Sequence, residues 1–406
     1  MTALTDIGQL ATCPPDDPGA GLVDRAALVW DEGVVVWAGP EADLPARFAD
    51  AERLSAHGGL VVPGLVDCHT HLVHAGDRSG EFVERIEGTP YLEIAGRGGG
   101  ILSTVRATRA ASDADLEASG RERLDAMLRQ GVTTVEAKSG YGLTVADEMR
   151  TLRVHRRLAD AGPQRIVSTL LAAHAVPPEY ADDRAGYVRL VVDEMIPKAA
   201  ADGLAAFVDV FVEQGAFTGS EARTIFAAAA AHGLGAKLHA DQLSDTGGAA
   251  LSASVGAASA DHLEYVSDAG GAALAAAGVV AVSLPIATLV LGQEPLPARR
   301  LLDAGVRVAV ATDFNPGSAP SASLPLAMWL ACTRQRMTPA EALRGATVEA
   351  ARALRLDGVG TLVPGGVADV AVFEAPSLYA WLAGWRAEPA ARAVAAGETV
   401  WMRDEG

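Results

Sequence analysis

Residues 63–71 read PGLVDCHTH, and this stretch holds the most informative pattern in the chain. Leu65–Cys68 is a short apolar run typical of a buried strand, and His69 and His71 follow where the run ends. Two histidines separated by one residue on an extended backbone project to the same side, so both imidazoles can bind one metal ion. The pair alone is a weak signal, because a single histidine at a strand end is more often a hydrogen-bonded core residue.

Further strand-like runs follow along the chain, separated by helical stretches. The eight runs are Leu65–Cys68, Val132–Ala137, Ile166–Ala172, Phe207–Val212, Ala236–Leu238, Ala257–Ala260, Val279–Leu284 and Val306–Ala311. Alternating buried strands and helices are typical of a parallel α/β fold, and eight of them predict a closed (β/α)8 TIM barrel. An open, doubly wound sheet is the alternative on topology alone. No glycine-rich dinucleotide or phosphate-binding motif follows any run, which disfavours that alternative.

The two ends of the chain are rich in short strands and turns. Residues 24–40, DRAALVWDEGVVVWAGP, predict a hairpin that turns at Asp31-Glu32-Gly33. Residues 361–376, TLVPGGVADVAVFEAP, and 391–403, ARAVAAGETVWMR, have the same character. Neither end is large enough for a stable domain alone. We therefore predict one small β-sandwich-like domain from residues 1–64 and 356–406, beside a barrel of residues 65–355.

The composition of the 406-residue chain limits its class and partners. Half of the residues are hydrophobic and the net charge is −18, which is globular composition and disfavours a nucleic-acid partner, since phosphate binding needs a basic face. Three widely spaced cysteines indicate a reducing compartment, and the N-terminus MTALTDIGQL has no signal-peptide pattern, so we expect a cytoplasmic protein. Residues 269–293 are uncharged, but glycines and Pro285 divide them into a helix and a buried strand, which predicts no membrane span.

Other runs also end in residues that can bind a metal or a substrate. The fifth run is followed by His239, the sixth by His262 and the eighth by Asp313, and His174 follows the third. In a parallel barrel the carboxyl ends of all strands meet on one face, where barrel enzymes hold their catalytic residues. The conjunction of these residues with the histidine pair predicts a metal site on that face.

The histidine pair, the later histidines and aspartate, and the C-terminal GTLVPGGVADVAVF resemble the amidohydrolase superfamily. Within it, the chain resembles the imidazolonepropionase family over essentially its full length. The motifs that carry this resemblance are HLVHAGDR, GGGILSTVRATRAAS, TTVEAKSGYGL, AHAVPPEY, KLHADQLSDTGGA, SADHLEY and ATDFNPGSAPSASLPLAM. It implies hydrolysis of the cyclic amide of 4-imidazolone-5-propanoate to N-formimidoyl-L-glutamate, in histidine degradation, by a homodimer with one zinc or ferric ion.

The resemblance also implies roles for individual residues. The implied metal ligands are His69, His71, His239 and Asp313. The implied catalytic residues are Asp313, His262 and Gln242. The implied substrate-binding residues are Arg78, Tyr141, His174, Gln242, Asn315, Gly317 and Ser318. Arg78 is expected to pair with the propionate, because a guanidinium binds a carboxylate through two hydrogen bonds; the alternative is a salt bridge with Asp77 or Glu81.

Several alternatives stay open. Deaminases of the superfamily usually carry glutamate where this chain has Gln242, and a glutamine cannot carry a proton at neutral pH, which favours a ring-opening hydrolase. Lys138 could be a carboxylated bridge between two metals, but its place on the second strand run favours one ion. Another cyclic amidohydrolase, a guanine-type deaminase, and a non-catalytic barrel that serves as a binding module are the rival functions. The residues do not distinguish zinc from iron and assign no role to Cys68 or His74.

Overall fold

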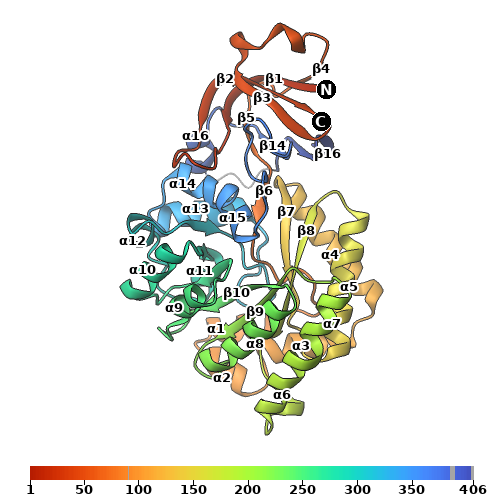
Figure 1. Cartoon of the computed structure of the whole chain (residues 1–406), viewed down its shortest axis with the longest axis vertical. Coiled ribbons are helices and arrows are strands. Elements are labelled where there is room, and N and C mark those ends of the chain that lie inside the picture. The colour runs from red at the N-terminus through yellow and green to blue at the C-terminus, as the bar shows by residue number, and fades with distance from the viewer. Residues whose placement is uncertain (90, 385–388, 404–406) are drawn as a thin grey trace.

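Both ends of the chain contribute strands to one sheet, which lies at the end of the molecule that carries the two termini in this computed structural model (Figure 1). The structure describes residues 1–89, 91–384 and 389–403. The strands of this terminal sheet are β1 (Thr2–Ala11), β2 (Leu22–Asp31), β3 (Val34–Pro40), β4 (Glu52–Ser55), β5 (Leu60–Pro63), β14 (Val370–Phe373), β15 (Arg392–Ala395) and β16 (Glu398–Met402). Their order is β16-β15-β14-β5-β1-β2-β3, with β4 paired to β1. Because β14 pairs with β5, the C-terminal strands join the N-terminal ones directly.

The predicted hairpin is confirmed as β2 and β3, which pair antiparallel. Glu32 and Gly33 form the turn with positive φ angles of 47° and 78°, the conformation that tight hairpin turns need. The indole N–H of Trp30 on β2 donates to the Gly397 carbonyl oxygen in the turn between β15 and β16, at 3.0 Å. The sheet therefore curls, so that strands from opposite ends of the chain share one apolar core.

Eight parallel strands form the barrel, as the sequence predicts. They are β6 (Leu65–Asp67), β7 (Val132–Lys138), β8 (Arg165–Ala173), β9 (Phe207–Val212), β10 (Gly235–Ala240), β11 (Ser259–His262), β12 (Val280–Ser283) and β13 (Val308–Val310), paired in chain order. The segments after β13 and β6 bring the first and last strands together. There, Asp313 N–H donates to the His69 carbonyl at 3.0 Å, and His71 N–H donates to the Phe314 carbonyl at 2.8 Å.

Helices surround the barrel strands (Figure 1). They are α1 (Ser79–Ile86), α2 (Tyr91–Gly96), α3 (Ile101–Ala110), α4 (Asp113–Leu128), α5 (Val145–Ala161), α6 (Arg184–Leu190), α7 (Ile196–Ala201), α8 (Gly219–Ala231), α9 (Gly248–Ser254), α10 (Asp268–Ala277), α11 (Pro285–Leu291), α12 (Ala298–Asp303), α13 (Leu324–Gln335), α14 (Pro339–Gly345), α15 (Val348–Ala353) and, near the terminal sheet, α16 (Leu378–Ala383). Capping boxes begin α8 at Thr218 and α14 at Thr338, where the side chain accepts a backbone N–H and a glutamate three residues later bonds back.

The uncharged stretch 269–293 divides as the sequence predicts. Its first part lies in α10, which ends at Gly278 with a φ of 68°, and its second part includes strand β12. Pro285 then begins α11, where a proline's missing N–H costs no hydrogen bond. Among the described residues, no helix combines the length and apolarity that crossing a bilayer requires.

Candidate active site

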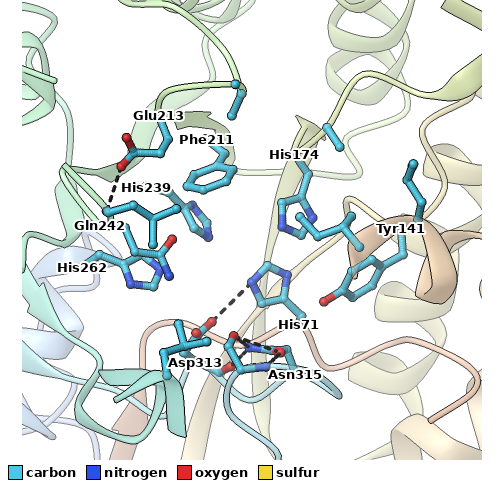
Figure 2. A pocket seen from close by; sticks show the side chains of 18 of the residues that line it. His71, Tyr141, His174, Phe211, Glu213, His239, Gln242, His262, Asp313 and Asn315 are labelled. Carbon is cyan, nitrogen blue, oxygen red and sulfur yellow. Dashed lines mark hydrogen bonds and ion pairs between the residues drawn. The ribbon is translucent and has the colours of Figure 1, made fainter. Parts of the chain in front are cut away.

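The polar residues at the carboxyl ends of the barrel strands converge on one place. His69 and His71 follow β6, His239 lies on β10, His262 ends β11 and Asp313 lies after β13. All five side chains are buried, with exposed fractions of 3% or less. Figure 2 shows His71, His239, His262 and Asp313 around one space. In the structure these five residues therefore lie together on a single face of the barrel, as predicted.

The potential ligand atoms form two overlapping groups. One is His69, His71 and Asp313, and the other is His69, His239 and His262; within each group the atoms lie within 4.8 Å of one another. Asp313 Oδ1 is 3.4 Å from His69 Nε2 and 3.5 Å from His71 Nε2. The predicted ligand His71 is in the first group and the predicted ligand His239 is in the second. His69 belongs to both groups. His262, predicted as a catalytic residue, is as close to His69 and His239 as a ligand would be.

Two of these imidazoles present nitrogens that fit a metal ion. His69 Nε2 and His239 Nε2 are buried and have no hydrogen-bond partner among the described residues. Unpartnered buried polar atoms are rare in proteins, because each loses its hydration without compensation. Imidazole nitrogens beside a carboxylate are the donor set that zinc and iron accept. The residues present therefore fit a bound cation.

The ionisation states of His71, His239 and Asp313 also suit metal binding, whereas at His69 the carboxylates of Asp261 and Asp313 outweigh burial and Lys138 and raise the pKa. Burial lowers the pKa of His239 to about 3 and lowers the pKa of His71 below its ordinary value, so both rings are neutral at pH 7. Burial alone would raise the pKa of Asp313, but the neighbouring His69 and His71 imidazoles hold that pKa well below its ordinary value. Neutral imidazoles and an ionised carboxylate are the forms that coordinate a metal.

The backbone is strained where two of the predicted catalytic residues lie. His262 has a φ of 78°, the following Leu263 one of 66°, and Asp313 one of 55°, all in the left-handed region that non-glycine residues avoid. Such conformations cost about 1–3 kcal/mol each and persist where surrounding structure enforces them, commonly at functional sites. Here the Leu263 N–H donates to the Ala240 carbonyl at 2.9 Å, which ties this turn to β10.

A cavity of about 360 Å³ opens beside the histidine and aspartate cluster. The predicted substrate-binding residues that line it are Arg78, Tyr141, His174, Gln242, Asn315 and Ser318. Gly317 does not line it. A side chain at Gly317 would instead overlap the Arg78 guanidinium, so this position must be glycine for Arg78 to lie where it does.

Comparison with known proteins identifies the family. The model of the Amidohydrolase family matches residues 60–400. The imidazolonepropionase of Geobacillus thermodenitrificans (strain NG80-2) is 52% identical over 359 residues, which cover 87% of this chain and 85% of that protein. The imidazolonepropionase of Paracoccus denitrificans (strain Pd 1222) is 50% identical over 367 residues, which cover 90% and 92%. The chain belongs to the imidazolonepropionases of the amidohydrolase family. It is a hydrolase that acts on carbon–nitrogen bonds.

Solved structures share the fold. The atrazine chlorohydrolase TrzN from Arthrobacter aurescens TC1, complexed with zinc, matches with a TM-score of 0.74 and 18% identity, over 99% of this chain and 95% of that one. The 5-methylcytosine deaminase from Klebsiella pneumoniae matches with a TM-score of 0.75 and 17% identity, over 100% and 98%. At such identities the likeness establishes the fold alone. It confirms the barrel with a sheet from both termini.

Tyr141 and His174 form one wall of the cavity with His71. The His71 and His174 rings stack with centroids 5.1 Å apart, and the Tyr141 ring lies 5.6 Å from His71 and 5.4 Å from His174 (Figure 2). Buried Glu148 fixes the loop that carries Tyr141. It accepts backbone N–H groups from Gly140, at 3.1 Å, and from the two residues after Tyr141, at 2.8 and 2.7 Å. Tyr141 is therefore a rigidly held loop residue that lines the cavity.

Arg78 lies at the first turn of α1 and pairs with Glu81. Its Nε donates to Glu81 Oε2 at 2.7 Å, and the other oxygen of Glu81 accepts the Gly100 N–H at 2.9 Å. The alternative salt bridge with Glu81 is therefore present, and the guanidinium also lines the cavity, while its pairing with a propionate stays a prediction. Glu81 fixes the direction in which Arg78 points.

Asn315 is engaged mainly in its own loop. Its Oδ1 accepts the N–H groups of Gly317 and Ser318, each at 2.8 Å, and its Nδ2 donates to the Asp313 carbonyl at 2.7 Å. The amide therefore shapes the loop beside Asp313, while the residue also lines the cavity. The implied part of Asn315 in substrate binding stays a prediction.

Phe211 and Glu213, at the end of β9, also line the cavity and were not identified from the sequence (Figure 2). Glu213 accepts the N–H groups of Leu243 and Ser244, at 2.8 and 3.2 Å, and so holds the segment that carries Gln242. The signal was available, because Glu213 directly follows the predicted run Phe207–Val212.

Proposed function

We propose that the chain hydrolyses the ring amide of 4-imidazolone-5-propanoate and releases N-formimidoyl-L-glutamate. The observation that carries this proposal is a small cavity lined both by a positioned arginine and by a histidine and aspartate cluster. A substrate with a carboxylate at one end and a cyclic amide at the other matches this arrangement. The 52% identity to a protein named imidazolonepropionase supports the same substrate.

One zinc or ferric ion would be held by His69, His71, His239 and Asp313. When bound there, such an ion supplies a water whose pKa is lowered to about 7, so that it attacks a carbonyl at neutral pH. The ammonium of Lys138 donates to Glu136 at 3.0 Å and to Asp209 at 2.8 Å. A lysine engaged in this way is not a carboxylated bridge, which supports a single ion.

Asp313 and His262 carry the protons in this proposal. Asp313 is ionised and reaches into the cavity, so it accepts the proton of the attacking water and returns it to the ring nitrogen that leaves. His262 faces the same space from β11 (Figure 2) and stabilises the negative charge that develops on the carbonyl oxygen. The carbon–nitrogen bond of the ring breaks, and the freed nitrogen stays in the formimino group.

Gln242 favours ring opening over deamination. Its side chain lies beside His262 at the cavity (Figure 2), where it can donate and accept hydrogen bonds but cannot transfer a proton. A deaminase needs a side chain that carries protons, because ammonia must be released from the ring of its substrate. Gln242 therefore orients the imidazolone ring, and Arg78 binds the propionate through charge-assisted hydrogen bonds.

The assembly and location proposed for the chain come from the family resemblance. We propose a homodimer in the cytoplasm that binds a small-molecule substrate. Sedimentation analysis of the full chain tests the dimer, and a monomer at micromolar concentration would contradict it.

The proposed reaction is tested by incubating the metal-loaded protein with 4-imidazolone-5-propanoate freshly made from urocanate. We expect formiminoglutamate to form, and Asp313→Asn to reduce its formation by about 100- to 10,000-fold, the range for loss of a general base. Guanine is the comparison substrate. Release of ammonia from guanine, with no formiminoglutamate from imidazolonepropanoate, would assign the chain to the deaminases instead.

A further inference from the structure

A set of buried charged side chains fills the barrel beneath the proposed metal ligands, and we call it the charge layer. Its members are Glu136 and Lys138 on β7, Asp209 on β9, Lys237 on β10 and Asp261 on β11, and each is fully buried. Interiors of such barrels are usually filled by branched apolar side chains. A charge in that position is strongly destabilising unless partners surround it, so an extensive network here requires an explanation.

Two members of the charge layer contact metal-site histidines from behind. Asp261 Oδ2 lies 2.6 Å from His69 Nδ1, and Asp209 Oδ2 lies 3.0 Å from His239 Nδ1. A carboxylate at Nδ1 fixes the tautomer and the direction of an imidazole, and leaves Nε2 as its ligand atom. The Nε2 atoms of both histidines are the ones that lack a hydrogen-bond partner in the described part of the chain.

Lys138 connects the two aspartates. Its Nζ is 2.8 Å from Asp209 Oδ2 and 3.5 Å from Asp261 Oδ2. A single ammonium group therefore lies behind both histidine–aspartate pairs. Without it, two carboxylates would face each other in an apolar interior, where repulsion and lost hydration would favour protonation or a different rotamer.

Glu136 and Lys237 complete the network around Lys138. Glu136 Oε1 is 3.0 Å from Lys138 Nζ, and its Oε2 is 2.9 Å from Lys237 Nζ. Lys237 also donates to the carbonyl oxygen of Cys68, the residue before His69, at 3.2 Å. The charge layer thus contacts both the side chain of His69 and the backbone that carries it. None of Glu136, Lys138 and Lys237 lines the cavity.

We propose that Lys138, Glu136 and Lys237 are positioning residues for the metal site. Lys138 aligns Asp209 and Asp261, which in turn align His239 and His69, while Glu136 and Lys237 hold Lys138 in place. The charge layer therefore sets the affinity for the ion without contacting the ion or the substrate. This inference rests on the proposed function, because it takes His69 and His239 as ligands.

The test compares zinc affinity between the parent chain and Lys138→Met. Each protein is made metal-free by chelation and titrated with zinc against a chromophoric chelator. Methionine keeps an unbranched chain of similar length but removes the charge, so we expect zinc affinity to fall about 10- to 100-fold, as for lost outer contacts in other metal sites. The matched control is Arg344→Met, which removes a buried cation paired with Glu349 at 2.7 Å and away from the cavity. Its zinc affinity should equal that of the parent.

A second variant, Glu136→Gln, keeps the shape of the side chain and guards against a folding failure of Lys138→Met. We expect weaker zinc binding and an altered visible spectrum of the cobalt-substituted protein, which reports ligand geometry.

If the parent binds no zinc, the proposed function itself fails. If the parent binds zinc and the folded variants bind it equally well, only the positioning role fails. If neither variant folds with zinc present, the charge layer is a requirement for folding and the positioning role is also rejected.

Discussion

Arg78 is the cavity residue whose position the structure defines most sharply beyond the histidine and aspartate cluster. Its guanidinium lies at the cavity with an exposed fraction of only 8%, held by Glu81 and packed against the backbone of Gly317. A cation with a fixed direction at the edge of a cavity suits recognition of a substrate carboxylate. Its removal should weaken substrate binding more than it slows the chemical step.

Arg78→Ala should raise KM for 4-imidazolone-5-propanoate by roughly 10- to 100-fold, the loss expected for hydrogen bonds to a charged group. The value of kcat and the metal content should change little. Steady-state kinetics and metal analysis measure the three quantities. Arg97→Ala is the control, because Arg97 is exposed and pairs with Glu84 away from the cavity. An unchanged KM in Arg78→Ala would remove this arginine from the substrate site.

At the scale of elements, helix α5 links the fold to the active site. Its residue Glu148 accepts three backbone N–H groups from the loop that carries Tyr141, and its residue His155 is fully buried with both ring nitrogens unpartnered among the described residues. The first arrangement stabilises the site, and the second costs stability. The two residues therefore predict opposite outcomes for substitutions in one helix.

Glu148→Gln should lower stability by about 1–3 kcal/mol, because one amide N–H would then face a backbone N–H in a buried place. It should also raise KM, since the Tyr141 loop loses its fixed position. Denaturant unfolding and kinetics measure both effects. Glu179→Gln, at an exposed site in contact with Arg109, is the comparison and should leave KM unchanged. A wild-type unfolding midpoint and KM in Glu148→Gln would contradict the role given to this carboxylate.

His155→Leu should stabilise the protein, and more so at pH 5.5 than at pH 7.5. Burial lowers the pKa of His155 to about 3, below its value of about 6.5 in an unfolded chain. Between these values the unfolded state binds the extra proton, so this residue makes stability fall as pH drops, by up to about 1.4 kcal/mol per pH unit. A leucine at this position does not titrate, so the variant lacks this loss of stability at low pH. Urea unfolding at the two pH values measures the difference, and an equal effect at both would refute it.

The sequence was most informative where a strand could be recognised from local chemistry. Phe207–Val212 is predicted with its observed bounds, because five of its six residues are apolar and either β-branched or aromatic, as in a buried strand. Val306–Ala311 is observed only as Val308–Val310, since its ends leave the ladder to enter loops. The network around Glu136 and Asp209 could not be predicted, because Asp209 and Lys237 reach Lys138 and Glu136 from other strands and no local pattern indicates which buried charges meet.

At the scale of the whole molecule, the order of strands around the barrel determines which residues meet. His69 and Asp313 are far apart in the sequence, yet the pairing of the segments after β6 and β13 places them side by side. The sequence predicted this convergence from the eight strand runs and from the histidines and aspartate that follow them. It did not reveal the arrangement of ligand atoms into two groups that share His69, because that depends on side-chain directions set by the charge layer.

The central claim is that one ion in this cluster makes the chain a hydrolase. Titration of the metal-free protein with zinc, while formiminoglutamate formation is followed, tests it most directly. The rate should rise from near zero and level off at one ion per chain. Full activity before any ion is added, or a plateau that requires two ions per chain, would contradict the claim.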